Sequence, residues 1–436
     1  MEGALREKIE KNRFILGILG LGRMGLPIAI KFASKKVQVI GLDINESLLR
    51  SVSSGSMPFK EENTQPLLRE ALKSKKLEVT SDEGRLGEAD VIIICIGMSL
   101  DEEIRPDFAS IISALKTLKP ALHESQLIIV RSTVSPGTCV NVIKPFIEEQ
   151  TSLVVGKDLF LAACPERVVE GSVMEELETL PEIIGGVDPA SAELAAAVFA
   201  KLGKEKSAVL MDSTSAEVAK LFSNVFRYVR FAIANEYALI AEHYGVNAHQ
   251  IISTINKDYP REHIPLPGPC GGPNFSKDGY FLLENAAIPD FILNAWKLNE
   301  NIPAYIVKRL RERLKEKGKR LEVCKVGVLG MAYKAEVDDL RQSPSLRMIE
   351  ILKKAGARVY AFDPFCSSDG LDTVLKDADA VVLMTNHSAF REISPAYAKK
   401  QAKKDCIFFD AWGMWDMKEW SKEKMDLQVF GGPPLS

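Results

Sequence analysis

Short, continuous runs of hydrophobic residues recur along the first half of the chain, and amphipathic stretches separate them. Continuous apolar runs are typical of strands buried on both faces of a parallel sheet, whereas the stretches between them have the period of helices. Strands that alternate with helices predict βαβ units, and therefore a doubly wound parallel sheet that binds ligands at the carboxyl ends of its strands. The predicted strands lie within residues 14–20, 37–43, 89–96, 127–138, 160–167 and 182–186.

The turn after the first predicted strand has the pattern of a dinucleotide site. Gly20, Gly22 and Gly25 form G-x-G-x-x-G, a helix pattern follows them, and the second strand ends at Asp43. The glycines permit a tight turn and the close approach of a pyrophosphate to the helix N-terminus. An acid at the end of the second strand suits the ribose hydroxyls and repels a 2′-phosphate, so the pattern predicts NAD rather than NADP.

The same alternation returns near the C-terminus, where apolar runs at 325–334, 357–364 and 378–384 predict a second nucleotide-type half. Its first turn contains only Gly327 and Gly330. We therefore expect this half to bind something other than a dinucleotide, or to bind it differently.

One long helix, predicted over residues 213–245, stands between the two halves. No proline interrupts the segment, Thr214 and Glu217 have the spacing of a capping box, and Gly245 suits a helix C-terminus. About thirty residues at roughly 1.5 Å each would make a rod on the order of 45 Å long. A Lys- and Arg-rich stretch at 301–322 predicts a further helix, which links the halves.

The two faces of the central helix differ in composition. At about 100° per residue, its polar side chains fall within an arc of roughly 80°, and its hydrophobic side chains occupy a different arc. The ordinary interpretation of a polar stripe is a solvated face. The position of the helix between two nucleotide-type halves, and a lysine and an asparagine four residues apart, favour a functional face instead. The polar stripe comprises Glu217, Lys220, Asn224, Arg227 and Asn235, and the hydrophobic arc comprises Leu221, Phe222, Val225, Val229, Ala232, Ile233, Leu239 and Ile240.

These elements predict an α/β protein in which two Rossmann-like, doubly wound parallel-sheet domains are joined by a long central helix. We expect a first sheet domain over residues 1–205, a helical domain with a glycine-rich loop over 206–300, and a second sheet domain over 301–436. The central helix has more apolar surface than two flanking domains need to cover. This favours a homodimer, or a multiple of one, built on the helix.

Composition narrows the class of protein. Hydrophobic residues make up 46% and charged residues 26% of the 436-residue chain, as in globular proteins with ample cores. The net charge of −3, without a concentrated basic block, argues against a nucleic-acid surface. The charged N-terminus predicts no signal peptide, and no apolar run approaches the ~18 residues of a membrane span. Seven scattered cysteines without metal-type pairs predict reduced core thiols in a cytoplasmic enzyme that has no metal site.

Polar residues follow two consecutive predicted strands, with Thr133 after one and Glu166 and Glu170 after the next. Each of them can be a turn or cap residue, and that interpretation suits Glu170 well. Because the carboxyl ends of parallel strands meet at one edge of a sheet, the clustering favours a site for Thr133 and Glu166.

Glycine and proline dominate residues 260–273, which predicts an ordered loop closed by Lys277 and Asp278. Such loops often wrap a ligand, and a plain domain linker is the alternative. Further on, Arg341 precedes a predicted helix and is a reasonable contact for a phosphate or a sugar. The histidines that show neither nucleophile–base nor metal spacing, and that we interpret as structural, are His243, His249 and His263.

Six motifs in this order resemble those of the UDP-glucose/GDP-mannose dehydrogenase family, and the resemblance covers nearly the whole chain. The run from CysProGluArgValValGlu to LeuProGluIleIleGlyGly is most similar to the branch that oxidises UDP-N-acetylhexosamines. The matching motifs are GlyLeuGlyArgMetGlyLeuPro, SerThrValSerProGlyThr at 132–138, ProGluArgValValGluGly at 165–171, AlaGluValAlaLysLeuPheSerAsn at 216–224, the glycine-rich loop ending in LysAsp, and AspAspLeuArgGlnSerPro at 338–344.

The resemblance implies oxidation of C6 of a UDP-sugar, a UDP-N-acetylhexosamine or UDP-glucose, to a carboxylate by a homodimer that reduces two NAD. It implies that Lys220 and Asn224 hold the developing oxyanion, that Thr133 and Asp278 position and activate water, and that Glu166 assists acid–base work. The implied cofactor contacts are Gly20, Gly22, Arg23, Met24, Gly25, Asp43, Thr133 and Lys277, and the implied substrate contacts are Glu166, Arg167, Lys220, Asn224, Arg261, Gly271, Lys334 and Arg341, with Arg341 reaching the sugar nucleotide from the C-terminal domain.

The sequence departs from the family at the nucleophile. The family's loop carries a nucleophilic cysteine three residues before the lysine of LysAsp, and that position here is Asn274. An asparagine cannot form a thiohemiacetal. Cys270, four residues earlier, is the alternative nucleophile, although such a shift rarely preserves attack geometry. A second departure is IleGlyMetSerLeuAsp at 96–101, where the family usually has ThrPro in place of MetSer.

We therefore expect an NAD-dependent nucleotide-sugar dehydrogenase whose second oxidation is slow or absent. Two alternatives stay open. The β-hydroxyacid dehydrogenases share GlyLeuGly-x-MetGly and a lysine on a central helix, but they lack the second nucleotide-type half. A catalytically silent nucleotide-sugar binder would explain Asn274, whereas retention of Thr133, Lys220, Asn224 and Asp278 argues against it.

Overall fold

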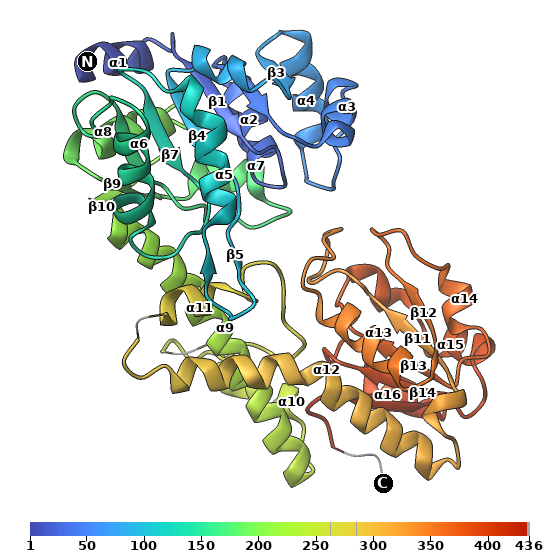
Figure 1. Cartoon of the computed structure of the whole chain (residues 1–436). Coiled ribbons are helices and arrows are strands. Elements are labelled where there is room, and N and C mark those ends of the chain that lie inside the picture. Colours follow the sequence, from blue (N-terminus) through green and yellow to red (C-terminus); the bar gives the residue numbers. More distant parts are fainter. Residues whose placement is uncertain (262, 285, 434–436) are drawn as a thin grey trace. The chain divides into compact units, whose positions relative to one another are not determined.

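A computed structural model describes residues 1–261, 263–284 and 286–433. The chain forms two compact units, one of Met1–Ser223 with Tyr280–Ala286 and the other of Asn224–Gly279 with Ala287–Ser436. Each unit contains one large sheet with helices around it (Figure 1). The predicted α/β fold is confirmed, and the division into three domains stays a prediction.

The first unit is built on an eight-stranded sheet. Neighbouring strands run parallel, except that β8 and β9 are antiparallel, so the sheet is mixed and not parallel throughout. The strand order is β10 (Ala208–Asp212), β9 (Glu182–Gly186), β8 (Phe160–Ala163), β7 (Leu127–Val130), β4 (Val91–Ile94), β1 (Ile15–Leu19), β2 (Gln38–Leu42) and β3 (Leu77–Thr80). A small hairpin is formed by β5 (Ser99–Leu100) and β6 (Pro106–Asp107).

Helices cover both faces of this sheet, which is why its central strands read as continuous apolar runs. One core cluster contains Ile18 and Ile93, and a second contains Ile92 and Ile94, so alternate residues of a strand enter opposite cores. The helices of this unit are α1 (Glu2–Glu10), α2 (Gly25–Ser34), α3 (Glu46–Ser53), α4 (Thr64–Lys73), α5 (Ala109–Leu118), α6 (Lys144–Gln150), α7 (Val173–Thr179) and α8 (Pro189–Phe199).

The second unit contains a parallel five-stranded sheet, which also has a core cluster on each face. Its strand order is β12 (Arg358–Phe362), β11 (Lys325–Leu329), β13 (Ala380–Leu383), β14 (Ile407–Asp410) and β15 (Asp426–Val429). Its helices include α10 (Ala248–Asn256), α12 (Asp290–Glu316), α13 (Pro344–Lys354), α14 (Leu371–Leu375), α15 (Pro395–Gln401) and α16 (Met417–Lys422), and the short α11 (Asp278–Leu283) has residues in both units.

The central helix α9 spans Ser213–Tyr244, 32 residues, and Gly245 follows it with φ of +67°. The predicted capping box is wrong. Asp212 caps the helix, because its carboxylate accepts the backbone N–H of Ser215 at 2.9 Å and the Ser215 hydroxyl at 2.5 Å. Glu217 points instead to another segment and accepts the backbone N–H groups of Gly137 and Cys139.

The helix predicted over 301–322 is α12, which begins at Asp290 and ends at Glu316. The predicted start at residue 301 is too late. Proline normally ends a helix, but Pro303 lies inside α12.

Candidate active site

The turn between β1 and α2 leaves room for a pyrophosphate. Gly20 has φ of +95°, and a Cβ on Gly25 would lie 1.8 Å from the Gly20 carbonyl oxygen, so both positions require glycine. A Cβ on Gly22 would meet nothing within 4 Å, so its backbone is open to a ligand. Arg23 and Met24 complete the turn, with the Arg23 guanidinium 5.1 Å from the centre of the Phe59 ring. These residues fit NAD.

Asp43 follows β2 and is only half-buried. One carboxylate oxygen accepts the backbone N–H of Leu21 at 2.7 Å, and the other accepts that of Asn45 at 2.8 Å. The carboxylate is thus fixed beside the glycine turn while part of it remains exposed, as a contact to ribose hydroxyls requires.

Asp43 provides a test of cofactor choice. We expect Asp43→Ala to weaken NAD binding and to reduce the preference for NAD over NADP by about tenfold, because the variant no longer repels a 2′-phosphate. Titration of wild type and variant with each cofactor measures the effect. Equal affinity of the wild type for NAD and NADP would contradict the assignment.

The segments after β7 and β8 are joined by buried charges. Glu166 is 8% exposed, and Arg131 pairs with it and with Glu182 of β9. Lys206 also contacts Glu182, at 2.9 Å. Arg167 and Glu170 are half-buried in the loop that follows Glu166.

The turn that carries Thr133 is held by helix α9. Glu217, 2% exposed, accepts the N–H groups of Gly137 at 2.6 Å and Cys139 at 2.9 Å. Burial raises the pKa of Glu217, although these backbone N–H groups favour its charged form. Lys220, one turn further along α9, is 7% exposed.

A second polar group lies around Asp278, whose side chain is fully buried. Its carboxylate accepts the Asn224 side-chain amide at 2.6 Å and the Lys277 ammonium at 2.9 Å. The structure thus brings together three residues that the resemblance assigned to the site. The charge and the hydrogen bonds hold the Asn224 side chain in one orientation.

The position of the family's nucleophile is exposed and occupied by Asn274, whose carbonyl accepts the backbone N–H of Asp278 at 3.0 Å. The alternative nucleophile, Cys270, is only 7% exposed, and burial raises its pKa. A buried thiol with a raised pKa holds little thiolate at neutral pH. The described part of this loop therefore contains no thiol suited to attack.

The polar stripe of α9 is mostly buried, so the solvated-face interpretation is wrong for it. Glu217, Lys220, Asn224 and Asn235 are each at most 7% exposed, and Arg227 is exposed. Asn235 is structural, because its amide exchanges hydrogen bonds with the backbone N–H and carbonyl of Gly268 at 2.8 and 3.1 Å.

The glycine-rich loop also contacts the turn before α13. The N–H of Gly272 donates to the Gln342 carbonyl at 3.1 Å, and a Cβ on Gly271 would lie 2.5 Å from that oxygen. This contact brings Gly271 close to the segment that contains Arg341. The Arg341 guanidinium pairs with buried Asp339 at 2.6 Å, while its side chain remains 54% exposed. Arg261 is exposed, with its guanidinium 4.9 Å from the centre of the Tyr259 ring, and no described contact joins it to this group.

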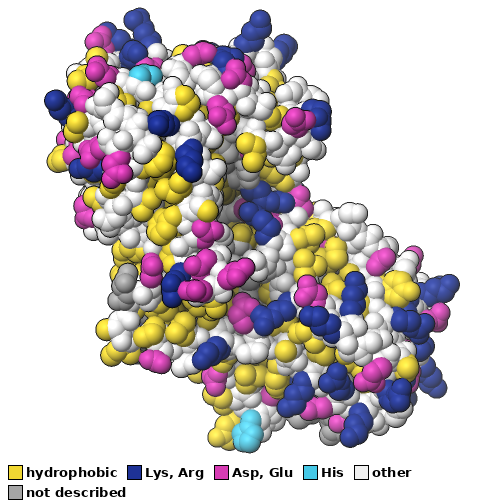
Figure 2. Space-filling model, in the orientation of Figure 1, with side chains coloured by type: hydrophobic (Ala, Val, Ile, Leu, Met, Phe, Trp, Pro, Cys, Tyr) yellow, Lys and Arg dark blue, Asp and Glu magenta, His cyan; other side chains and the backbone are white. Residues whose placement is uncertain are grey.

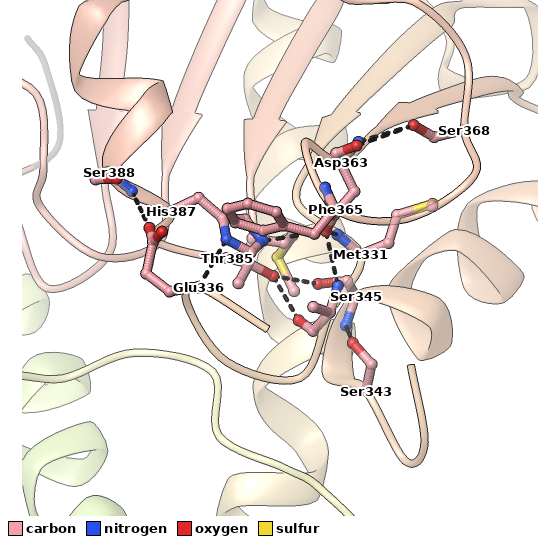
Figure 3. Close-up of polar contacts among 12 residues, drawn as sticks. Met331, Glu336, Ser343, Ser345, Asp363, Phe365, Ser368, Thr385, His387 and Ser388 are labelled. Atoms are coloured by element: carbon pink, nitrogen blue, oxygen red, sulfur yellow. Dashed lines mark hydrogen bonds and ion pairs between the residues drawn. The ribbon is translucent and has the colours of Figure 1, made fainter. Parts of the chain in front are cut away.

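In the C-terminal sheet, as in the first, an acid follows the second strand along the chain, but here its carboxylate is buried and hydrogen-bonded (Figure 3). Asp363 follows β12 and is 2% exposed. Its carboxylate accepts the N–H groups of Met331 and Ala332 at 2.7 and 2.9 Å and lies 3.1 Å from His387 Nε2. Burial opposes ionisation of Asp363, but these hydrogen bonds outweigh it and lower its pKa. Unlike Asp43, Asp363 offers no exposed oxygen to a ribose.

Gly330 follows β11 with φ of +89°, and Lys334 lies on the loop after it. The N–H of Glu336 donates to His387 Nδ1 at 3.0 Å, so Nε2 carries the proton that is shared with Asp363. Asp363 therefore cannot contact a ribose in the manner of Asp43, and what this half binds stays a prediction.

Among the described residues, His249 and His243 have no partners of the kind that a catalytic nucleophile or a metal site needs. His249 Nε2 lies 2.9 Å from the Phe430 carbonyl, and burial lowers its pKa. His243 contacts the ring of Tyr244 on the same helix. Within the described ranges, no group of three or more His, Cys, Asp or Glu side chains could hold a metal ion. No described helix has both the length and the apolar character needed to cross a membrane.

Sequence reasoning missed two charged residues in the first unit. Arg131 belongs to no motif, but a charged residue directly between an apolar run and SerThrVal is a signal that it has a buried partner. Glu217 was assigned to its own helix, since the local capping pattern is indistinguishable in sequence from a contact 80 residues away.

Comparisons with known proteins show which proteins the chain is similar to. The chain matches the NAD-binding domain of the UDP-glucose/GDP-mannose dehydrogenase family over residues 15–203, its central domain over 214–302 and its UDP-binding domain over 327–417. It is 36% identical to a UDP-N-acetyl-D-mannosamine dehydrogenase of Pyrococcus horikoshii over 87% of this chain and 91% of the relative. It is 32% identical to the Methanocaldococcus jannaschii protein of the same description, over 97% of this chain and 98% of the relative.

Solved structures show the same likeness. The structure of a Pyrococcus horikoshii UDP-D-ManNAc dehydrogenase superposes with a TM-score of 0.90 at 33% identity, covering 96% of this chain and 99% of that one. A Staphylococcus aureus UDP-N-acetyl-mannosamine dehydrogenase has a TM-score of 0.84 at 31% identity, with 96% and 98% coverage. The predictions of an NAD cofactor and of a dehydrogenase are confirmed. The three domain models of this family together match most of the chain. The chain therefore belongs to the UDP-glucose/GDP-mannose dehydrogenase family.

Proposed function

We propose that the protein oxidises C6 of a UDP-N-acetylhexosamine with NAD and releases mainly the 6-aldehyde or its hydrate. The sugar class is supported by relatives described as UDP-N-acetyl-D-mannosamine dehydrogenases and by one described as an NDP-N-acetyl-D-galactosaminuronic acid dehydrogenase. The observation that carries the proposal is the intact Asn224–Asp278–Lys277 arrangement beside a loop that has Asn274 in place of a thiol.

The first oxidation requires no covalent nucleophile. The C6 hydrogen leaves as hydride and the hydroxyl proton passes to solvent, which yields the aldehyde; NAD, when bound, supplies the hydride acceptor. Lys220 and Asn224 stabilise negative charge on the C6 oxygen, and burial makes this stabilisation stronger than it would be in water. Asp278 orients Asn224 for this purpose.

The second oxidation normally passes through a thiohemiacetal, which presents a tetrahedral carbon for the second hydride. Without a thiol, water must add to the aldehyde to give the hydrate before the acid can form. Asp278 is the group that we assign to this water. Since water is a weaker nucleophile than a thiolate, the second step is slow.

One experiment tests the proposal. Purified protein is incubated with NAD and a panel of UDP-sugars, NADH is counted by absorbance, and the products are weighed by mass spectrometry. We expect NADH from UDP-N-acetylhexosamines and a product two mass units lighter than its substrate, or the hydrate of that product. Binding of the sugar nucleotides without any NADH would favour the silent binder, and turnover of small β-hydroxyacids would favour the other alternative.

We also propose that α9 forms the core of a homodimer. Its exposed apolar residues recur at spacings of three, four or seven positions and fall within an arc of about 60°. A helix stripe of this width suits pairing with an identical helix. Hydrophobic side chains also reach the surface on the face shown in Figure 2. The exposed residues of the α9 stripe are Phe222, Phe226, Ile233, Tyr237, Ile240 and Tyr244.

The double change Phe226→Glu with Tyr237→Glu tests the dimer. We expect it to convert a dimer to a monomer at micromolar concentration, because burying two carboxylates in each copy costs several kcal/mol. Light scattering measures the mass. Phe291→Glu is the matched control, since Phe291 is equally exposed on α12 and lies outside the stripe. A monomeric wild type would contradict the proposal.

A further inference from the structure

One loop of the C-terminal unit, residues 330–336, is held at both ends by buried side chains (Figure 3). It follows β11 and carries Lys334, which is half-buried, and we call it the Lys334 loop. In a nucleotide-type sheet, the turn after the first strand is the one whose backbone N–H groups normally bind phosphate.

Four backbone N–H groups of the Lys334 loop are donated to other parts of the same unit, and this leaves none of the four for a phosphate. The donations are Met331 to Asp363 at 2.7 Å, Ala332 to Asp363 at 2.9 Å, Tyr333 to the Asp339 carbonyl at 3.0 Å and Glu336 to His387 Nδ1 at 3.0 Å. A diphosphate at this turn therefore needs a cationic side chain, and Lys334 is the cation that the loop carries.

Thr385 fixes the beginning of the loop. It is 1% exposed, and its hydroxyl donates to the Ala332 carbonyl at 2.7 Å. Gly330 has φ of +89°, and a Cβ there would lie 2.4 Å from the Thr385 side chain, so this position requires glycine. The backbone that leads to Lys334 is thus held against the end of β13.

The end of the loop is fixed at Glu336. Its N–H donates to His387, and its side-chain Oε1 accepts the backbone N–H of Ser388 at 2.7 Å. Glu336 has φ of +64°, a conformation that a residue other than glycine keeps only where its surroundings hold it. Since Glu336 lies two residues after Lys334, these contacts fix the backbone that carries the lysine.

His387 connects the two ends of the loop. It is fully buried, and its Nε2 lies 3.1 Å from Asp363 Oδ2, the oxygen that also accepts two N–H groups at the start of the loop. The rings of Phe365 and Phe390 pack edge-on against the imidazole, with centres 5.1 and 5.6 Å away, and hold its orientation. One side chain therefore links the start of the loop, through Asp363, with its end at Glu336.

We propose that His387 is a positioning residue for the nucleotide part of the substrate: it fixes the Lys334 loop so that the lysine ammonium meets the diphosphate of UDP. The inference rests on the proposed function, because it takes a UDP-sugar as the substrate. The match to the UDP-binding domain, over residues 327–417, includes both the loop and His387. Because His387 is fully buried, it acts on the substrate only through the loop.

Two amide variants separate the two hydrogen bonds of His387. In His387→Asn, the shorter amide can place its oxygen near the Nδ1 position and still accept from Glu336. In His387→Gln, the longer amide reaches the Nε2 position and still donates to Asp363, but it leaves the N–H of Glu336 without its acceptor. The glutamine variant should therefore release the end of the loop, and the asparagine variant should retain it.

Calorimetric titration of the full-length proteins with UDP measures the effect. We expect UDP affinity to fall about tenfold or more in His387→Gln and less in His387→Asn. With a UDP-sugar, KM should rise in the same order while kcat stays within about twofold, as for a loss of binding alone. Wild-type UDP affinity in His387→Gln, or a fall of kcat without a rise of KM, would overturn the inference.

His249→Gln is the matched control. His249 is a half-buried histidine of the same unit whose Nε2 lies 2.9 Å from the Phe430 carbonyl, away from the Lys334 loop in sequence and in its contacts. We expect this variant to retain the UDP affinity of the wild type. An equal loss of UDP affinity in His249→Gln and His387→Gln would mean that both act only through stability, and would contradict the proposal.

A double-mutant cycle with Lys334→Ala tests whether His387 acts through the lysine. If it does, His387→Gln should cause little further loss of UDP affinity in the Lys334→Ala background, whereas losses that multiply would overturn the inference. Wild-type UDP affinity in Lys334→Ala alone would overturn it as well. Should His387→Gln fail to fold, His387→Asn takes its place, and its smaller loss should likewise vanish in that background.

UDP binding requires neither NAD nor turnover, so this inference and the proposed function can fail separately. If UDP affinity depends on His387 through Lys334 but no UDP-sugar yields NADH, only the proposed function is wrong. If UDP-sugars yield NADH but UDP affinity does not depend on His387, only the positioning role is wrong.

Discussion

Asn274→Cys should raise the yield of NADH from about one toward two per sugar nucleotide, because it restores the thiol that the second oxidation uses. Asn274 is exposed, and its backbone carbonyl is already fixed by the N–H of Asp278, so a side chain of similar size should not disturb the loop. Lys277 and Asp278 lie three and four residues further on, at the spacing that the family's cysteine has. NADH absorbance together with the mass of the product measures the outcome.

Two controls separate a thiol effect from a change in the loop. Asn274→Ser has nearly the same size as the cysteine variant but lacks a comparable nucleophile, so it should stay near one NADH per sugar, about the wild-type value. Cys270→Ala should leave the product distribution unchanged, because Cys270 is buried with a raised pKa. A wild type that already forms two NADH at a rate similar to its first step would contradict the prediction, and loss of acid in Cys270→Ala would then identify the nucleophile.

Asp278→Asn should lower kcat by about 10²- to 10⁴-fold while the affinity for NAD is retained. The carboxylate accepts hydrogen bonds from Asn224 and Lys277, and the neutral amide loses the charge that holds Lys277 and part of the orientation of Asn224. Since the glycine turn and Asp43, which fit the pyrophosphate and the ribose of NAD, lie in the first unit, cofactor titration should change much less than kcat. Steady-state rates and NAD titrations measure the two quantities.

The control for Asp278 is Asp410→Asn. Asp410 is an equally buried carboxylate whose pKa burial raises to about 6, and it accepts the N–H groups of Trp412 and Trp415. We expect this variant to change thermal stability without a comparable loss of kcat. Equal losses of kcat in the two variants would mean that Asp278 acts only through stability.

The assignment of elements to helices and strands followed from local pattern. The first strand, the glycine turn and Asp43 were all predicted, because a turn that requires positive φ at Gly20 and no side chain at Gly25 leaves few residue choices. The long helix was also predictable from local pattern, because its helical period extends over 32 residues. The antiparallel pairing of β8 with β9 was not predicted, because an apolar run has the same appearance in either direction.

The site was only partly predictable. Thr133, Glu166, Lys220, Asn224 and Asp278 came from motifs, and the structure joins Asn224 to Asp278 across 54 residues. The partner of Glu166 did not come from any motif. A pairing between residues 35 positions apart depends on which strands are neighbours, and no local pattern encodes that.

By itself the sequence determined the fold class, the family, the choice of NAD and the absence of a thiol at position 274, because each of these depends on residues that are adjacent or periodic along the chain. Only the tertiary structure decided that Glu217 caps a distant turn, that Asp363 is sealed by His387, and that Arg131 balances two carboxylates. The physical reason is burial. A charge taken out of water must find its partner in space, and the position of that partner is set by the packing of the sheets rather than by the neighbouring sequence.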